Sequence, residues 1–341
     1  MKENSINKKA KKQRQNLLRT LFWLAAVGSL LWVILKRSGE IAQELQSVSW
    51  VQLINPLLLL VLILPLMGLN SWVSLRYLDS RYSYLEAAGF YFGSQGPKYL
   101  PGGFWAFPSR MVFYSSKGTS ATYAILSVFR EVAALFLSAA AVGVVGVLQG
   151  ITTLEVRWAV LLGALFSLAA ILLTSFSGFW KLVSRIPPGI QLPFSDLIKD
   201  KEKRSLRWLL PTFSVSVVFW LALGLPFQNL IQAIEPSVQL SWLQAASIFA
   251  LAWCGGFVVV VIPEGLGVRE TLLTILLSQF MPESSALTIA LTARIWWMLA
   301  EAVYIVISLF WLTRTIRFKP ALQLFRKKNV NDMEGEDNAR K

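Results

Sequence analysis

The sequence of 341 residues contains no histidine and only one cysteine, Cys254. An intrachain disulfide is therefore impossible, and zinc sites and histidine-based acid–base catalysis lose their usual ligands and bases. Cys254 lies in an apolar run, so we interpret it as a small buried hydrophobic residue. We expect no metal site and no cofactor.

Charged residues are also scarce. They make up 15% of the chain, whereas hydrophobic residues make up 55%; ordinary globular domains contain about 25% charged residues. Several apolar runs reach about 18 residues or more, which is long enough for a helix to cross a bilayer. The composition therefore predicts an all-α, polytopic membrane protein.

The apolar runs divide the chain into spans and tails. About six full spans are predicted, near 17–35, 51–75, 119–148, 156–176, 208–230 and 287–312. We interpret the first run as an uncleaved anchor, because Lys36 and Arg37 follow it directly and no signal-peptidase-like site is present. The predicted organisation is a basic tail at 1–16, a transmembrane domain at 17–315 and a tail at 316–341 that we expect to be disordered.

Basic residues follow a pattern along these spans. They account for the net charge of +14 and cluster in 1–19, in 181–207 and after Arg314, whereas the loops between these regions carry little positive charge. Such a distribution is typical of loops and tails on the cytoplasmic side of a membrane. It predicts cytoplasmic N- and C-termini, and no nucleic-acid partner.

Two further apolar regions, 84–118 and about 242–280, are interrupted by helix breakers. The first contains Pro101-Gly102-Gly103 and then Arg110; the second contains Pro263-Glu264-Gly265 and then Arg269. A long span follows each of them, with Arg130 and Glu131 in the first case and Arg294 and Glu301 in the second. The chain therefore contains a weak internal repeat, at about 84–148 and 242–312.

The number of crossings predicts how the two repeats are oriented. If both broken segments are re-entrant helical hairpins, the first enters from the cytoplasm and the second from the opposite face. This is an inverted repeat, in which transporters place the substrate where broken helices meet near the middle of the membrane. Two complete membrane crossings in each segment would leave the following spans in the same orientation. The number of crossings therefore does not decide whether the segments are re-entrant. In either case the breaks should face protein or water.

Glycine-rich breaks followed by a helix start favour anions, because backbone N–H groups and the helix dipole point at the ligand. Arginine adds a planar fork that suits phosphate oxygens. The candidate substrate-binding residues are Arg110, Arg130, Arg269, Arg294, Glu131, Glu270, Glu301, Gly102, Gly103, Gly265 and Gly267. The alternative is that the charges form structural ion pairs between helices. Lys98 is either a headgroup contact or an interfacial residue, and we interpret Trp296 and Trp297 as packing residues.

No catalytic set is recognised in the sequence. There is no nucleophile–base pair, no metal motif of the D-x-D type near a membrane edge and no P-loop. We therefore expect a protein that is not an enzyme. Any transport would be passive, coupled to an ion, or driven by a partner.

The motifs "PEGLGVRE" with the following "TLL", "KYLPGGFWAFPSR" and the pair Arg130-Glu131 resemble a known family. It is the flippase-type transmembrane domain of bacterial lysylphosphatidylglycerol synthases, which uncharacterised bacterial membrane proteins share. The resemblance covers roughly 15–315, and it extends to the membrane part of certain archaeal dolichol-phosphate mannosyltransferases. The family usually has Pro-Gly-Gly-Leu-Gly-Val-Arg-Glu, so Glu264 departs from the pattern. The soluble synthase domain is not recognised, so synthase activity is not inferred.

The resemblance implies that the protein handles a phospholipid or a polyprenyl-phosphate-linked lipid in the bacterial inner (plasma) membrane. Our first hypothesis is a lipid flippase or transporter that holds an anionic headgroup with arginines at the paired breaks. The alternative is a non-transporting accessory protein that presents a lipid-linked substrate to a separate glycosyltransferase or other lipid-modifying enzyme. A membrane-embedded transferase is the least favoured hypothesis, because no catalytic base is recognised.

Overall fold

A computed structural model describes residues 39, 48–79, 81–99, 105–150, 165, 169, 206–258 and 267–315. Within these ranges the regular elements are all helical. Their bounds are α3 Trp50–Ile63, α4 Pro65–Arg76, α5 Tyr84–Gly93, the 3-10 helix η1 Gly96–Tyr99, α6 Ala106–Ser116, α7 Ala121–Leu148, the 3-10 helix η3 Leu206–Trp208, α11 Leu209–Ile234, α12 Trp242–Val258, α13 Val268–Leu277 and α14 Glu283–Thr315. The spans predicted at 17–35 and 156–176, and both tails, lie outside the described residues.

Four stretches of the described chain are long and apolar enough to cross a membrane. They are Trp50–Arg76, Tyr123–Gly146, Leu206–Ile234 and Glu283–Arg314. These correspond to the spans predicted at 51–75, 119–148, 208–230 and 287–312. The all-helical class and the multi-pass membrane character are therefore confirmed.

The first of these stretches contains two helices that local sequence signals separate. Ser49 and Gln52 form a capping box at the start of α3, which satisfies backbone N–H groups that have no partner within the helix. Pro65 occupies the first turn of α4, where its missing N–H costs little. Pro56 lies inside α3 and removes one helical hydrogen bond there.

Both interrupted regions form a helix, a break and a second, short helix. In the first, α5 leads through η1 to α6; in the second, α12 leads to α13. Each region follows a long apolar stretch, and α7 or α14 then continues the chain. The order of elements therefore occurs twice: long stretch, helix, break, short helix, long helix. Gly102, Gly103 and Gly265 lie in the parts of the breaks that are outside the described residues.

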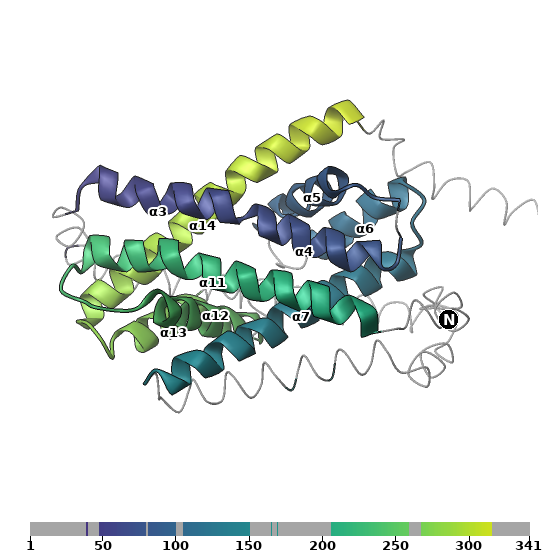
Figure 1. The fold of residues 1–341 in the computed structure, drawn as a ribbon. Coiled ribbons are helices and arrows are strands. Elements are labelled where there is room, and N and C mark those ends of the chain that lie inside the picture. The colour runs from purple at the N-terminus through teal and green to yellow at the C-terminus, as the bar shows by residue number, and fades with distance from the viewer. Residues whose placement is uncertain are drawn as a thin grey trace, which may run out of the picture.

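The two broken regions lie toward opposite ends of an elongated helical bundle. In Figure 1, α5 and α6 lie toward the right-hand end and α12 and α13 toward the left-hand end, while α7, α11 and α14 run between the ends. The main core joins α5, α7, α11, α12, α13 and α14 through large side chains such as Trp220, Phe249 and Trp297. Cys254 belongs to this core and is buried, as predicted.

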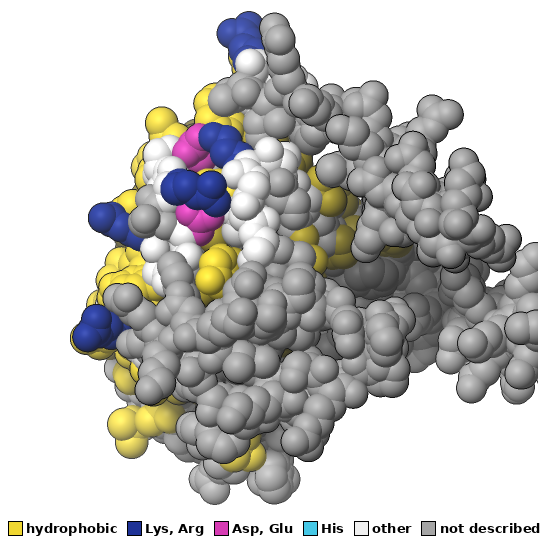
Figure 2. All heavy atoms as spheres, turned by 90° about the vertical axis from the view of Figure 1, so that its right-hand side faces the viewer, with side chains coloured by type: hydrophobic (Ala, Val, Ile, Leu, Met, Phe, Trp, Pro, Cys, Tyr) yellow, Lys and Arg dark blue, Asp and Glu magenta, His cyan; other side chains and the backbone are white. Residues whose placement is uncertain are grey.

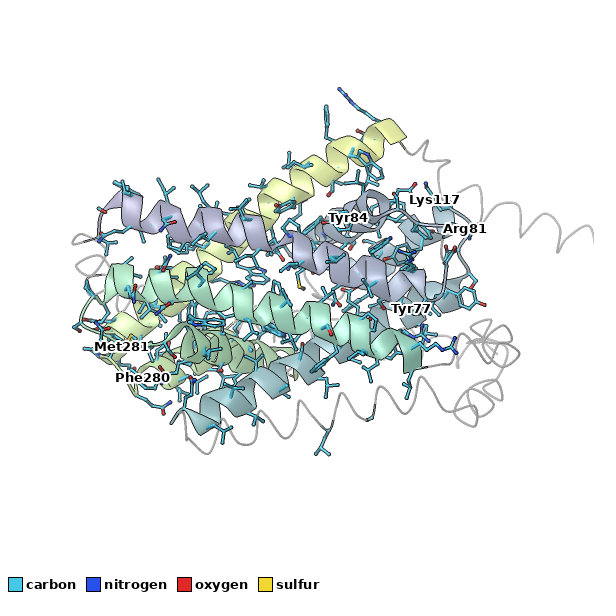
Figure 3. All side chains as sticks on the ribbon, in the orientation of Figure 1. Tyr77, Arg81, Tyr84, Lys117, Phe280 and Met281 are labelled. Atoms are coloured by element: carbon cyan, nitrogen blue, oxygen red, sulfur yellow. The ribbon has the colours of Figure 1, made fainter. Side chains whose placement is uncertain are left out.

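The two ends of the bundle differ in charge. Figure 3 places Arg81 and Lys117 at the end that carries α6, and Phe280 and Met281 at the other end. Figure 2 views the first of these ends directly and shows Lys and Arg side chains with acidic side chains beside them. The described loops at the opposite end, 235–241 and 278–282, contain Glu235 and neither Lys nor Arg.

Candidate functional site

A tightly held ion pair joins α6, which follows the first break, to α7. Arg110 Nη1 donates to both oxygens of Glu131, at 2.9 Å to Oε1 and 2.8 Å to Oε2. Arg110 Nε donates to Ser94 Oγ at 3.2 Å, and its guanidinium lies 4.5 Å from the centroid of the Tyr91 ring. Both charged side chains are buried. These contacts occupy Arg110, so its clearest role is to join α6 to α7.

Arg130 precedes Glu131 on α7 but faces a different neighbour. Its guanidinium lies 5.1 Å from the ring centroid of Trp208, at the start of α11. The side chain is buried. Adjacent residues on an α-helix point about 100° apart, which explains why Arg130 and Glu131 contact different elements. Arg130 therefore lies between α7 and α11, whereas Arg110 lies within the hairpin.

The first break is also joined to α14. Lys98 Nζ lies 2.8 Å from Glu301 Oε1, and the hydroxyl of Tyr99 donates to Glu301 Oε2 at 2.5 Å. The side chains of Lys98 and Glu301 are 6% and 4% exposed. This contact joins η1, at the start of the first break, to the middle of the last long helix.

The second break begins α13 with a glycine in the left-handed region. Gly267 has a φ of 85°, a conformation that glycine adopts without steric cost. Its N–H donates to Glu270 Oε2 at 2.7 Å, so the Glu270 side chain caps its own helix. Glu270 is buried. The capping bond fixes the position of its other oxygen, Oε1.

Arg294 on α14 faces this second oxygen at a longer distance. Its Nε lies 3.7 Å from Glu270 Oε1, and its side chain is 11% exposed. Within the described part of the chain, the buried atoms Arg294 Nη1 and Glu270 Oε1 have no hydrogen-bond partner. Buried polar atoms without partners are uncommon and costly. Arg294 and Glu270 therefore form an incomplete pair, an ionic contact without a hydrogen bond. Arg110 and Glu131, in contrast, form both an ionic contact and hydrogen bonds.

Arg269 lies beside Glu270 and packs against two aromatic rings. Its guanidinium lies 4.5 Å from the ring centroid of Phe249 and 5.0 Å from that of Trp297. A Cβ atom at Gly256 would lie 3.0 Å from Arg269 Cβ, so the glycine allows α12 to approach α13 closely. At the start of α13, Arg269 thus lies close to α12, and Glu270 lies close to Arg294 on α14.

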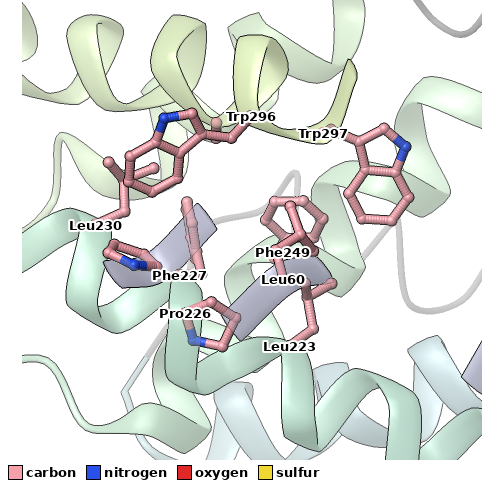
Figure 4. Close-up of a pocket in the computed structure, with 10 residues that line it drawn as sticks. Leu60, Leu223, Pro226, Phe227, Leu230, Phe249, Trp296 and Trp297 are labelled. Carbon is pink, nitrogen blue, oxygen red and sulfur yellow. The ribbon is translucent and has the colours of Figure 1, made fainter. Parts of the chain in front are cut away.

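The same two rings form one wall of an apolar cleft. Side chains from α3, α11, α12 and α14 line this cleft. Figure 4 shows Trp296, Trp297 and Phe249 around the same space as Leu60 and Pro226. Arg269 therefore packs against two of the rings that line this small apolar cleft.

The sequence identified many of these residues but not all of their partners. The expected pairing of glutamates with arginines is observed for Glu131 and Glu270, whereas Glu301 pairs with Lys98 instead. Arg110 and Arg269 belong to different hairpins, and α14 contacts both breaks. Phe249 and Tyr99 were not singled out, because aromatic residues in apolar runs give no signal that distinguishes a site from packing. Glu264 lies outside the described residues.

A protein-family model, described as the transmembrane (TM) region of lysylphosphatidylglycerol synthase, matches residues 20–321. The chain belongs to this family. The resemblance inferred from the two glycine-containing motifs is therefore confirmed, and the family match includes both broken regions and all the charged residues described above. Membership supports a lipid-related role in a membrane. No curated protein matches the chain.

Proposed function

We propose that this protein is a lipid flippase or transporter that moves a phosphate-bearing lipid across the bacterial inner membrane. The observation that carries the proposal is Arg294 beside the second break. Its buried Nη1 has no hydrogen-bond partner within the described chain, and the N-terminus of α13 begins at the same place. An arginine with an unused donor next to a helix start suits a phosphate group.

The arrangement of the hairpins supports alternating access. The repeated order of elements, and the location of the two hairpins toward opposite ends of the bundle (Figure 1), fit an inverted repeat. In this proposal both hairpins are re-entrant, and the full chain has about six complete spans. The breaks then approach each other within the membrane, and non-helical backbone at that depth faces protein or water.

The charge difference between the two ends supports an orientation. Arg81 and Lys117 lie at the end with α6 (Figure 3). Arg76 ends α4, Arg207 directly precedes α11 and Arg314 lies in the last turn of α14, and these helix ends point the same way in Figure 1. The positive-inside rule places this end in the cytoplasm. The first hairpin then opens toward the cytoplasm and the second toward the opposite side, and both termini are cytoplasmic.

The two contacts of α14 supply a way to couple the hairpins. Arg294 and Glu301 are seven residues apart on this helix, which corresponds to about 10 Å along its axis. One contacts the second hairpin and the other contacts the first. A phosphate at Arg294 competes with Glu270, whose 3.7 Å contact is weaker than a charged hydrogen bond of about 2.8 Å. Movement of α14 on binding then changes the position of Glu301 relative to Lys98.

The remaining charged pair has a structural role in this proposal. Arg110 and Glu131 satisfy each other in the resting hairpin and join α6 to α7. The proposed protein carries out no covalent chemistry. Its transport is passive, coupled to an ion, or driven by a partner.

The direct test is transbilayer movement of a fluorescent phosphatidylglycerol in proteoliposomes that contain only the purified protein, followed by dithionite quenching. Wild-type protein should accelerate movement, and Arg294→Gln should reduce the rate by about tenfold or more, because a charged hydrogen bond to the phosphate is lost. Arg314→Gln, at the exposed end of the same helix, is the matched control and should move lipid at the wild-type rate. If wild-type protein moves no lipid, the accessory role replaces the flippase role.

A further inference from the structure

Glu270 differs from the other buried glutamates of the described chain, because one of its carboxylate oxygens lacks a hydrogen bond. Both oxygens of Glu131 accept hydrogen bonds from an arginine, and those of Glu301 accept from a lysine and a tyrosine. In Glu270, Oε2 accepts from the Gly267 N–H at 2.7 Å, whereas Oε1 has no donor within the described residues. A proton can therefore be added at Glu270 Oε1 without breaking a hydrogen bond.

The ionic surroundings of Glu270 are simple. The two helices α12 and α14 pack against α13, and α12 has a single titratable side chain, the buried thiol of Cys254. On α13 itself, the guanidinium of the neighbouring Arg269 packs against two aromatic rings. The titratable residues of α14 are Glu283, Arg294, Glu301, Tyr304 and Arg314. Among them, Arg294 makes the ionic contact, with its Nε 3.7 Å from Glu270 Oε1.

A phosphate bound at Arg294 changes the balance of charge. Before binding, the charges of Arg294 and Glu270 cancel. The phosphate adds a second anion beside the same arginine, and two anions that share one site disfavour each other. A buried carboxylate that loses its cation is also costly, and such a group takes up a proton instead. The site therefore favours a neutral Glu270 once the phosphate is bound.

The proton transfer restores neutrality in a way that fits the geometry. Glu270 Oε1 takes a proton from solution and becomes an O–H group, while the Arg294 guanidinium keeps its proton and the phosphodiester keeps its single negative charge. The new O–H can donate to a phosphate oxygen, and a hydrogen bond to an ionised acceptor is among the strong ones. The side chain of Arg294 is 11% exposed, so water reaches the edge of the pair.

We propose that Glu270 is a proton-binding site and that each anionic lipid bound at Arg294 brings one proton with it. This inference rests on the proposed function and names the ion to which transport is coupled. The proton and the lipid favour each other's binding to the same extent, because coupling between two ligands is reciprocal. The occupied site has the same net charge as the empty one, since one proton accompanies one phosphodiester.

The first test measures proton uptake when phosphatidylglycerol binds to the purified full-length protein in weakly buffered detergent. This lipid suits the test because its phosphodiester stays singly ionised around neutral pH and exchanges no proton itself. Wild-type protein should take up about one proton per bound lipid, and Glu270→Gln should take up none. The matched control is Glu235→Gln, a loop carboxylate that accepts from serine hydroxyls, and it should behave as wild type. Binding to wild type without proton uptake would overturn the proposal.

The pH dependence of the dissociation constant separates a proton site from a merely structural helix cap. Wild-type affinity should fall as the pH rises, by up to about tenfold per pH unit, because each bound lipid requires a proton. The affinity of Glu270→Gln should not change with pH, whereas Glu270→Asp retains a carboxyl and should retain the dependence. The aspartate variant and the wild-type uptake keep the proposal testable if Glu270→Gln fails to fold. Parallel pH profiles for wild type and Glu270→Gln would overturn it.

A pH gradient across proteoliposomes tests transport and separates this inference from the proposed function. Wild-type protein should move fluorescent phosphatidylglycerol toward the leaflet on the alkaline side, beyond the movement in protein-free liposomes. Wild-type movement that ignores the gradient would overturn proton coupling and leave the flippase proposal standing. Proton uptake on binding without transbilayer movement would have the opposite meaning: the proton site stands, but the protein does not flip lipid alone.

Discussion

Lys98 Nζ lies 2.8 Å from Glu301 Oε1, although the two residues are 203 positions apart. Both side chains are buried, and the contact joins the first helix break to α14. Removal of one member of a buried ion pair costs about 3–5 kcal/mol, because the other charge is left without its partner. We expect Glu301→Gln to lower stability by an amount of this order, measured as a decrease in the thermal unfolding temperature in detergent.

The control for this prediction is the double variant. Lys98→Met together with Glu301→Gln removes both charges and should recover part of the lost stability. A double-mutant cycle then gives the coupling between the residues. Strict additivity of the two single effects would show that the contact contributes nothing to joining the first break to α14.

Arg110 and Arg294 should respond differently to substitution. Arg110→Gln breaks a complete, buried pair with Glu131 and should lower stability by about 3 kcal/mol or more. Arg294→Gln breaks an incomplete pair and should cost about 1 kcal/mol, with its main effect on lipid movement. Thermal unfolding and the proteoliposome rate, measured on the same samples, check both expectations. A larger loss of stability for Arg294→Gln than for Arg110→Gln would reverse the roles assigned to them.

Gly267 and Gly118 form a matched pair of glycines with positive φ, at 85° and 81°. An L-residue in this region costs about 1–2 kcal/mol, so Gly267→Ala and Gly118→Ala should lower the unfolding temperature to a similar extent. Only Gly267 donates its N–H to Glu270, so only Gly267→Ala should also change lipid movement. Equal transport rates in the two variants would show that the geometry of the second break does not matter for transport.

Asp79 lies in the loop between α4 and α5, outside the membrane spans. Its carboxylate accepts hydrogen bonds from Arg81 and from Thr119 Oγ1, and the Arg81 contact in particular lowers its pKa from 3.8 to about 2. A lowered pKa in the folded state stabilises the protein above about pH 4, and this contribution is lost as the pH falls from about 4 to 2. Its size is roughly 1–2 kcal/mol, since Arg81 is exposed to solvent.

The prediction for Asp79 is a difference that depends on pH. At pH 6, Asp79→Asn should unfold at a lower temperature than wild type, and the two curves should converge toward pH 2. Glu235→Gln at the opposite end provides a comparison with another loop carboxylate. A difference between Asp79→Asn and wild type that stays constant from pH 6 to pH 2 would contradict the proposed ionic contact.

The helical architecture could be predicted from the sequence because apolar length and helix breakers are local signals. The long apolar runs gave the four described spans, and the Pro and Gly clusters marked the two breaks. Arg110 with Glu131 could also be anticipated, since the two residues belong to consecutive helices, α6 and α7. In each of these cases the information lies within about 30 residues of chain.

The remaining contacts depend on long-range packing, which one sequence does not encode in any local pattern. The pairing of Glu301 with Lys98 requires α14 to cross the first break, and only the three-dimensional arrangement shows this. Arg294 and Glu301 lie seven residues apart on α14, yet Arg294 contacts Glu270 of α13 and Glu301 contacts Lys98 at the first break. Trp297 was predicted to be a packing residue; it does pack in the core, and it also separates the cleft from Arg269.

The central claim is that a lipid phosphate replaces Glu270 at Arg294. The most direct measurement is the dissociation constant of phosphatidylglycerol, obtained by native mass spectrometry for wild type, Arg294→Gln and Glu270→Gln. Glutamine at 270 can still accept the Gly267 N–H but no longer attracts Arg294. The account predicts opposite changes: weaker binding in Arg294→Gln, by about tenfold, and tighter binding in Glu270→Gln. If Arg294 and Glu270 form only a structural ion pair, both variants should change the affinity for phosphatidylglycerol in the same way. Equal losses of affinity would therefore contradict a phosphate site at Arg294.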